Sequence, residues 1–339
     1  MPTETEIRNL LLEKAMLPAS LGRLEELSVR LGTMGAFDLE KPMLLLFAAD
    51  HGITAEGVTH SAKAISYEMS RAFAHGYGAA GLFASLNNVP MAVIDVGLDT
   101  DETDEAIINR KIAHGTKDFL FADAMTETEE ETAFSIGSEM VEMAKNKGCD
   151  IVLFGEMGVG NSTAASAVIA RLCSSGVEEV TTSASGLSAD ELSHKREVVK
   201  AGLALHPEKK GKEVIRAFGG FETAAIAGAM VTASRLSIPI LLDGMITNAA
   251  ALAAVDMDER VKGHLIAGHR SAAAGADLAL DVLGLSPVLE LGMQLGEGTG
   301  ALAAWPVVRL ASHLVHGLKG FGELGVEDST KNLQRLGLL

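Results

Sequence analysis

Short apolar segments recur along the chain, and most of them end in a polar residue or a glycine. They occupy residues 43–49, 91–94, 151–154, 238–242 and 265–268. Longer stretches rich in alanine, glutamate and methionine separate them. Buried strands that alternate with helices are typical of a parallel sheet covered on both faces. The pattern therefore predicts the α/β class, with a doubly wound, mostly parallel sheet and helices on both of its faces.

The residues that directly follow these segments carry charged or imidazole side chains. They are Asp50, His51, Asp95, Glu156, Asp243 and His269. Ligands of open parallel sheets bind beyond the carboxyl ends of the strands, where these residues fall. Each one taken alone is equally consistent with a helix cap or a turn. Taken together, they favour a polar cleft.

Both ends of the chain have a different pattern. Leucines recur at helical spacing between Leu10 and Leu31 and again between Leu310 and Leu324, with no alternation of strands and helices. We therefore predict a small helical domain built from residues 1–40 and 311–339. Residues 41–310 would form the α/β domain that binds the ligand.

Composition narrows the class of protein. The 339 residues carry a formal charge of −17, and aromatic residues make up only 4%. An acidic surface repels phosphate backbones and few aromatics are available to stack on bases, so we expect no nucleic-acid partner. Cys149 and Cys173 form no Cys-x-x-Cys pair, the N-terminus has no apolar signal segment, and the charge-free stretch 72–94 contains asparagines and a proline. These features predict a cytoplasmic protein without a membrane partner.

A glycine-rich segment at residues 155–163 follows a predicted strand and precedes an alanine-rich helix. Glycines allow a sharp turn, Asn161, Ser162 or Thr163 can cap the helix, and the free N–H groups of a helix N-terminus attract phosphate. The segment is not a Walker A loop, because no Gly-Lys-Ser/Thr follows. It predicts a phosphate site, with a purely structural turn as the alternative.

A second glycine-rich segment at residues 291–301 contains Glu297 between two glycines. Its sequence neighbours offer no side chain to pair with the carboxylate, which suits a base or a charge stabiliser in a cleft. A surface-loop glutamate is an equal alternative. The ten histidines form no His-Glu-x-x-His or comparable pattern, so we expect no metal site. Lys195 falls in a charged helix, where a solvated side chain is the usual case.

Five segments in chain order carry a more specific signal. They are residues 47–53, 155–163, 216–222, 242–244 and 295–301. Together they resemble the nicotinate-nucleotide–dimethylbenzimidazole phosphoribosyltransferase family, over a match from about residue 40 to past Trp305. The resemblance implies a parallel α/β domain with a small helical domain from both termini, and a dimer with its active site near the subunit interface. It implies transfer of ribose 5-phosphate from nicotinate mononucleotide to a benzimidazole-type base, with release of nicotinate.

The resemblance also implies roles for individual residues. Glu297 would be the catalytic base and Glu156 a second catalytic carboxylate. The 5-phosphate would lie on the backbone of Gly158, Val159 and Gly160, with Lys195 as its charge partner. The implied substrate-binding set is Gly158, Val159, Gly160, Asn161, Lys195, Asp243, Gly244, Ser271, Gly296, Gly298, Asp50 and His51. No cofactor and no metal are implied.

The chain departs from the family pattern at three places. Gln294 replaces a usual arginine, Ala273 begins a pair that replaces Glu-Pro, and residues 57–69 lack an expected proline, glutamine and asparagine. These changes leave the reaction type in place and the acceptor open among a benzimidazole, a purine and a phenol. One alternative is a phenol-activating homologue; another is a silent partner subunit of a heterodimeric enzyme instead of a homodimer. A nucleotide-dependent oxidoreductase is disfavoured, because no Gly-x-Gly-x-x-Gly motif opens the chain.

Overall fold

A computed structural model describes residues 2–183, 186–207 and 209–328. The chain divides into two compact units: Lys41–Ala304, and Met1–Glu40 together with Trp305–Leu339. The second boundary of this division lies six residues before the boundary expected from the sequence. Whether the two units are independent domains stays a prediction.

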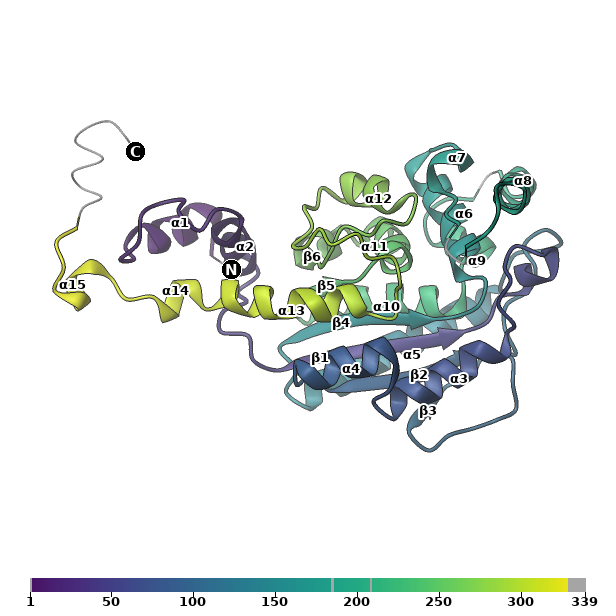
Figure 1. The fold of residues 1–339 in the computed structure, drawn as a ribbon, viewed down its shortest axis with the longest axis horizontal. Coiled ribbons are helices and arrows are strands. Elements are labelled where there is room, and N and C mark those ends of the chain that lie inside the picture. Colours follow the sequence, from purple (N-terminus) through teal and green to yellow (C-terminus); the bar gives the residue numbers. More distant parts are fainter. Residues whose placement is uncertain (1, 184–185, 208, 329–339) are drawn as a thin grey trace. The chain divides into compact units, whose positions relative to one another are not determined.

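The larger unit is built on a six-stranded sheet in the order β3-β2-β1-β4-β5-β6 (Figure 1). The strands are β1 (Pro42–Ala49), β2 (Met91–Gly97), β3 (Ile107–Asn109), β4 (Ile151–Met157), β5 (Ile240–Leu242) and β6 (Leu265–Ala267). All five pairings between neighbouring strands are parallel. The order reverses between β1 and β4, and such a switch point opens a crevice for ligands at the carboxyl ends of the strands.

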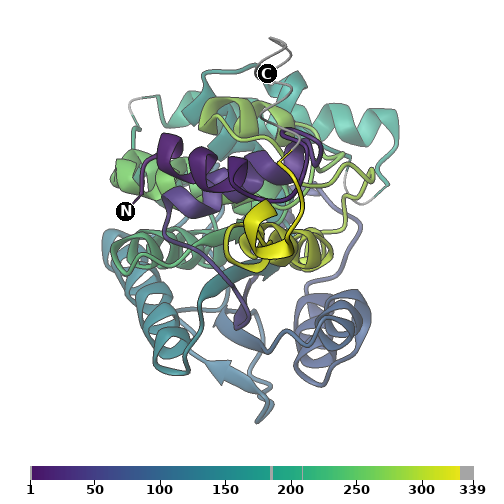
Figure 2. The same ribbon diagram turned by 90° about the vertical axis from the view of Figure 1, so that its left-hand side faces the viewer.

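Alternate residues of a strand point to opposite faces of the sheet, and helices cover both of these faces. Leu45 and Phe47 of β1 pack in one core cluster with residues of α5 and α10. Leu46 and Ala48 pack in another with residues of α3 and α4. Figure 2 shows the dark blue helices α3 and α4 and the blue-green helix α5 on opposite sides of the strands. The predicted doubly wound α/β fold is confirmed.

The helices of the larger unit follow the strands in sequence. They are η1 (Gly52–Glu56), α3 (Ala64–Ala74), α4 (Gly78–Leu86), α5 (Glu127–Asn146), α6 (Asn161–Cys173), α7 (Val177–Val180), α8 (Ala189–Leu205), α9 (Lys212–Phe218), α10 (Phe221–Arg235), α11 (Met245–Met257), η2 (Glu259–His264) and α12 (Ala276–Leu283). The small residues of α5 and α10 permit a close crossing: a Cβ on Gly137 would lie 1.9 Å from the Ala225 carbonyl oxygen. The helix α13 (Thr299–Ser312) begins in this unit.

The smaller unit contains α1 (Glu4–Leu12), α2 (Arg23–Thr33), α14 (Leu314–Gly317) and α15 (Phe321–Leu324). Ile7, Leu11, Val29 and Val315 form its core. The predicted leucine stripe is only partly buried, because the chain between α1 and α2 is not helical and exposes Leu17 and Leu21. Across the described ranges, none of the helices combines the length and apolarity needed to cross a membrane.

Candidate active site

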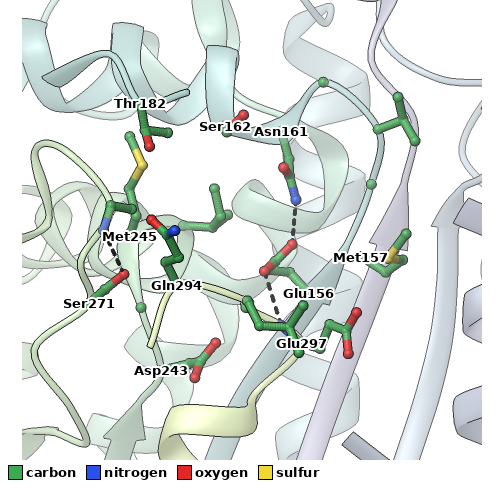
Figure 3. Close-up of a pocket in the computed structure, with 18 of the residues that line it drawn as sticks. Glu156, Met157, Asn161, Ser162, Thr182, Asp243, Met245, Ser271, Gln294 and Glu297 are labelled. Atoms are coloured by element: carbon green, nitrogen blue, oxygen red, sulfur yellow. Dashed lines mark hydrogen bonds between the residues drawn. The ribbon is translucent and has the colours of Figure 1, made fainter. Parts of the chain in front are cut away.

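A pocket of about 210 Å³ lies beyond the carboxyl ends of β4 and β5, beside the switch point of the sheet (Figure 3). Four segments build most of its wall: Glu156–Ser162, Asp243–Ile246, Ser271 with Ala273, and Gln294–Glu297. Thr59, Ser61 and Ile65 close one side, and Thr182 lies on the wall as well. Of the six polar strand ends seen in the sequence, Glu156 and Asp243 line this cleft, whereas Asp50, His51, Asp95 and His269 do not.

Most residues of the predicted site line this pocket. They are Glu156, Gly158, Val159, Gly160, Asn161, Asp243, Gly244, Ser271, Gly296 and Glu297. The structure places Asp50, His51, Lys195 and Gly298 outside the lining. Lys195 bonds to the lining residue Ser162, and Gly298 to the lining residue Asp243. His51 packs against a lining segment, and Asp50 is linked to the lining residue Val159 through Ser66.

The turn between β4 and α6 has the geometry of an anion site. Gly160 is the N-cap of α6 with φ of 99°, and it makes no side-chain cap bond, so the predicted polar cap is wrong. In the described chain, the amides of Gly160 and Ser162 have no hydrogen-bond acceptor, whereas the amide of Val159 donates to Ser66 Oγ at 3.0 Å. A Cβ on Gly158 would lie 2.0 Å from the Ala49 carbonyl oxygen, so only glycine fits there. Two free amides at a helix N-terminus can hold a phosphate.

Lys195 of α8 places a positive charge behind this turn. Its side chain is 1% exposed, and its Nζ donates to Ser162 Oγ at 3.0 Å and to the Thr182 carbonyl at 3.1 Å. Burial lowers the pKa of Lys195 to about 8. The structure therefore does not show the solvated side chain that is usual for a lysine in a charged helix: the ammonium group lies one side chain behind the pocket wall, where it favours a bound anion.

Glu297 stands at the tip of a strained loop. Gly296, Glu297 and Gly298 have φ of 85°, 65° and 77°. A left-handed glutamate costs about 1–3 kcal/mol and persists only where its surroundings enforce it. The Asp243 carboxylate enforces it by accepting the amides of Gly298 (3.1 Å), Gly300 (2.6 Å) and Ala301 (3.2 Å). Asp243 therefore anchors the loop and the start of α13.

Glu156 completes a pair of carboxyl groups in the cleft. Its Oε1 accepts the amide of Glu297 at 3.3 Å, and its Oε2 accepts the Asn161 side-chain amide (Figure 3). Burial, reinforced by the charges of Asp243 and Glu222, raises the pKa of Glu156 to about 8. The sequence around Glu297 contains no charged neighbour, but the fold brings Glu156 at the end of β4 and Asp243 after β5 close to it.

Glu297 is the carboxylate with free bonding capacity. It is 9% exposed, and among the described residues its Oε2 has no hydrogen-bond partner. Burial, together with the charge of Asp243, raises the pKa of Glu297 to about 7. A buried carboxylate that lines a cleft and has a pKa near neutrality is suited to accept a proton.

Asp50 and His51 lie behind the turn instead of in the cleft. Asp50 accepts Ser66 Oγ at 2.5 Å and the Asp99 amide at 2.9 Å. His51 Nε2 pairs with Glu222 Oε1 at 3.0 Å, with both side chains buried. The side chains of both residues therefore form hydrogen bonds with other parts of the protein.

Sequence reasoning missed several lining residues. Thr59, Ser61, Ile65, Ser162, Thr182, Met245, Ile246 and Leu295 line the pocket without having been predicted as site residues. Ser162, Met245, Ile246 and Leu295 adjoin predicted positions, and extending those motifs by one or two residues would have found them. Thr182 had no local signal. In residues 2–328, leaving out 184–185 and 208, no group of three or more His, Cys, Asp or Glu side chains is arranged to hold a metal ion.

Comparisons with known proteins agree with this architecture. A family model described as phosphoribosyltransferase, DBI_PRT, matches residues 2–326. A protein of Bradyrhizobium sp. (strain BTAi1) named nicotinate-nucleotide–dimethylbenzimidazole phosphoribosyltransferase is 37% identical over 334 residues, which are 96% of this chain and 95% of that protein. A protein of the same name from Chromobacterium violaceum is 39% identical over 315 residues, or 91% of each chain. The crystal structure of CobT from Thermus thermophilus matches with a TM-score of 0.92 at 35% identity, covering 96% of this chain and 98% of that chain.

Proposed function

The chain belongs to the phosphoribosyltransferase family of that model, and we propose that it transfers ribose 5-phosphate from nicotinate mononucleotide to dimethylbenzimidazole. The products are a ribosyl phosphate of the benzimidazole and free nicotinate. The observation that carries the proposal is the placement of Glu297: an unpaired, buried carboxylate of raised pKa shares one pocket with the phosphate-type turn at Gly160.

The proposed reaction needs a general base for the acceptor, whereas the leaving group needs no general acid. Nicotinate leaves C1′ from a pyridinium, so the electron pair of the broken C–N bond neutralises the ring without a proton. One ring nitrogen of the acceptor forms the new bond to C1′ with its lone pair. The other nitrogen then carries a proton that the product must lose. The Glu297 carboxylate, which lines the pocket, accepts this proton.

The donor is held by its phosphate. The free amides of Gly160 and Ser162 and the hydroxyl of Ser162 face the same end of the pocket, and the ammonium of Lys195 lies directly behind them. We assign the 5-phosphate to this end. With the phosphate there, the ribose extends toward Glu156 and Glu297. The negative charge of ionised Glu297 stabilises the positive charge that develops at C1′ as nicotinate departs.

Glu156 is assigned a positioning role in this scheme. Its Oε1 accepts the amide of Glu297, so it fixes the backbone on which the base is mounted. Its pKa of about 8 keeps much of its population protonated at neutral pH, which limits repulsion between the two carboxyl groups. Glu297 is thereby left as the group that changes its protonation during the reaction.

The acceptor is assigned to the apolar part of the pocket. Ile65, Met245, Ile246 and Leu295 line it, and an aromatic bicycle without charge is favourably buried against such side chains. The Bradyrhizobium and Chromobacterium relatives are named for a benzimidazole acceptor. Their names offer no support for a phenol-activating enzyme or a silent subunit.

We further propose that the protein works in the cytoplasm as a homodimer, as the family resemblance implies. The chain has a mass of 35.4 kDa, so a dimer has twice that mass, about 71 kDa. Light scattering coupled to size-exclusion chromatography measures this directly. A mass equal to that of one chain would contradict the dimer.

The proposed reaction is tested with the purified protein, nicotinate mononucleotide and dimethylbenzimidazole. Liquid chromatography with mass spectrometry should detect nicotinate together with an adduct whose mass equals the benzimidazole plus the ribosyl phosphate. A purine and a phenol, each offered alone, report the acceptor range, and a sample without acceptor reports hydrolysis. An absence of nicotinate release with every acceptor would overturn the proposed function.

A further inference from the structure

The first strand end holds a buried hydrogen-bond chain that leads to the phosphate turn. Asp50 Oδ2 accepts the amide of Asp99 at 2.9 Å, and Asp50 Oδ1 accepts the hydroxyl of Ser66 at 2.5 Å. Ser66 Oγ in turn accepts the amide of Val159 at 3.0 Å. Asp50 and Ser66 are 1% and 0% exposed, so water does not replace any of these bonds.

The bonding roles in this chain are fixed by elimination. Asp50 as a carboxylate only accepts, so Ser66 must donate its single hydroxyl hydrogen to it. The oxygen of Ser66 is then left with lone pairs only, which it presents to the Val159 N–H. Because Asp50 takes the hydroxyl hydrogen of Ser66, Ser66 can only accept from the Val159 N–H. This bond holds the backbone between Gly158 and Gly160 in one orientation.

The same serine connects the two ends of the pocket. Ser66 lies in the first turn of α3 and directly follows Ile65, which lines the apolar part of the pocket. Lys63, at the N-cap of α3, pairs with Asp99 at 2.8 Å, which adds a second tie to the same network. The start of α3 is therefore bonded both to the phosphate turn and to the residue whose amide Asp50 accepts.

We propose that Asp50 and Ser66 are positioning residues that set the phosphate turn through Val159 and tie the acceptor wall at Thr59–Ile65 to it. The proposal rests on the proposed function, since it assigns the donor phosphate to that turn. Neither residue lines the pocket, so both act through the backbone of Val159 and the start of α3.

The test compares two serines of the same helix. Ser66→Ala removes the acceptor of the Val159 amide, whereas Ser70→Ala removes an equally buried hydroxyl that bonds only to the Ser66 carbonyl at 2.7 Å. Losing one buried hydrogen bond weakens binding about tenfold, so Ser66→Ala should raise KM for nicotinate mononucleotide by about tenfold with kcat within about threefold of wild type. KM for dimethylbenzimidazole should rise as well. Ser70→Ala should leave all three constants within about twofold.

Asp50→Asn provides a second route to the same result. With its oxygen toward the Asp99 amide, the new side chain turns an N–H group toward Ser66, whose hydroxyl hydrogen then has no acceptor. In the reverse orientation Ser66 keeps its acceptor, but an N–H group faces the Asp99 N–H. Either way one bond of the network is lost. Asp50→Asn should reproduce the rise in KM, and the double variant should be no worse than the stronger single variant, because both act through one amide. If Ser66→Ala does not fold by circular dichroism, Asp50→Asn carries the test.

Three outcomes are distinguishable in one assay. A wild-type protein that releases no nicotinate would remove the proposed function, and the positioning role with it. An active wild type with Ser66→Ala matching Ser70→Ala would overturn the positioning role alone. A rise in KM for the nucleotide without any rise for the benzimidazole would overturn the tie to the acceptor wall.

Discussion

Glu297 and Glu156 are chemically identical side chains that their surroundings make different. The Glu156 oxygens both accept hydrogen bonds from the protein, whereas Glu297 Oε2 has no partner within the part of the chain that the structure describes. Both pKa values are raised, to about 8 and about 7, because the groups are buried beside Asp243. These contacts support the proposed roles of Glu156 as a positioning residue and Glu297 as the base.

Removing the base should affect turnover more than binding. Glu297→Gln should retain binding of nicotinate mononucleotide by calorimetry and lower kcat by about 10²–10⁴-fold, the usual scale for a lost general base. In wild type, kcat/KM should rise with pH through about 7, because the base acts only when it is ionised. The variant should lose this rise.

Glu290→Gln is the matched control, because it makes the same change on an exposed glutamate in the same segment between α12 and α13. It should behave as wild type. Turnover of Glu297→Gln within a few-fold of wild type would show that Glu297 is not the base, and Glu156 would become the candidate.

Glu156 should make the protein less stable as the pH rises. Its pKa is about 8 in the folded protein and 4.5 for a free side chain, so between these values the folded state holds a proton that the unfolded state has released. The free energy of unfolding then falls with pH by about 1.4 kcal/mol per unit from this group. Glu156→Gln should therefore raise the melting temperature more at pH 8 than at pH 5. Glu142→Gln, on the exposed face of α5, should show no such dependence, and a pH-independent effect of Glu156→Gln would contradict the assignment.

At the scale of elements, the loop before α13 is shaped by consecutive left-handed residues. A Cβ on Gly296 would lie 2.4 Å from Glu156 Oε1, whereas one on Gly292, with φ of 67°, would meet nothing within 4 Å. Alanine costs about 1–2 kcal/mol of strain at either position. Gly292→Ala should lower stability and retain activity, whereas Gly296→Ala should also lower kcat/KM by at least about tenfold. Equal kcat/KM for the two variants would show that the contact with Glu156 does not matter.

The sequence predicted elements where one local pattern decides the structure. The apolar runs at 43–49 and 151–154 became central strands, because a strand buried on both faces needs a continuous apolar run. The edge strand β3 (Ile107–Asn109) was missed, because its two isoleucines are followed directly by polar residues and form no recognisable apolar run. The family resemblance, and not the local sequence, pointed to Lys195, because its burial depends on Ser162 and Thr182, which the fold brings from other elements.

At the scale of the whole molecule, the net charge opposes the donor substrate. The chain carries −17, and nicotinate mononucleotide is itself an anion. Raising the ionic strength from about 0.01 M to about 0.15 M shortens the screening length from about 30 Å to about 8 Å. KM for the nucleotide should therefore fall as salt is added over this range. KM for the uncharged dimethylbenzimidazole is the internal control and should not change. A nucleotide KM that rises with salt would show that local positive charge dominates its approach.

The proposed reaction requires one arrangement: the donor phosphate at the start of α6 and its C1′ beside Glu297. A crystal structure of the protein with nicotinate mononucleotide tests it directly. We predict phosphate oxygens within about 3.2 Å of the amide nitrogens of Gly160 and Ser162, with C1′ facing the Glu297 carboxylate. A phosphate bound elsewhere, with the Gly158–Ser162 turn covered by side chains, would contradict the account.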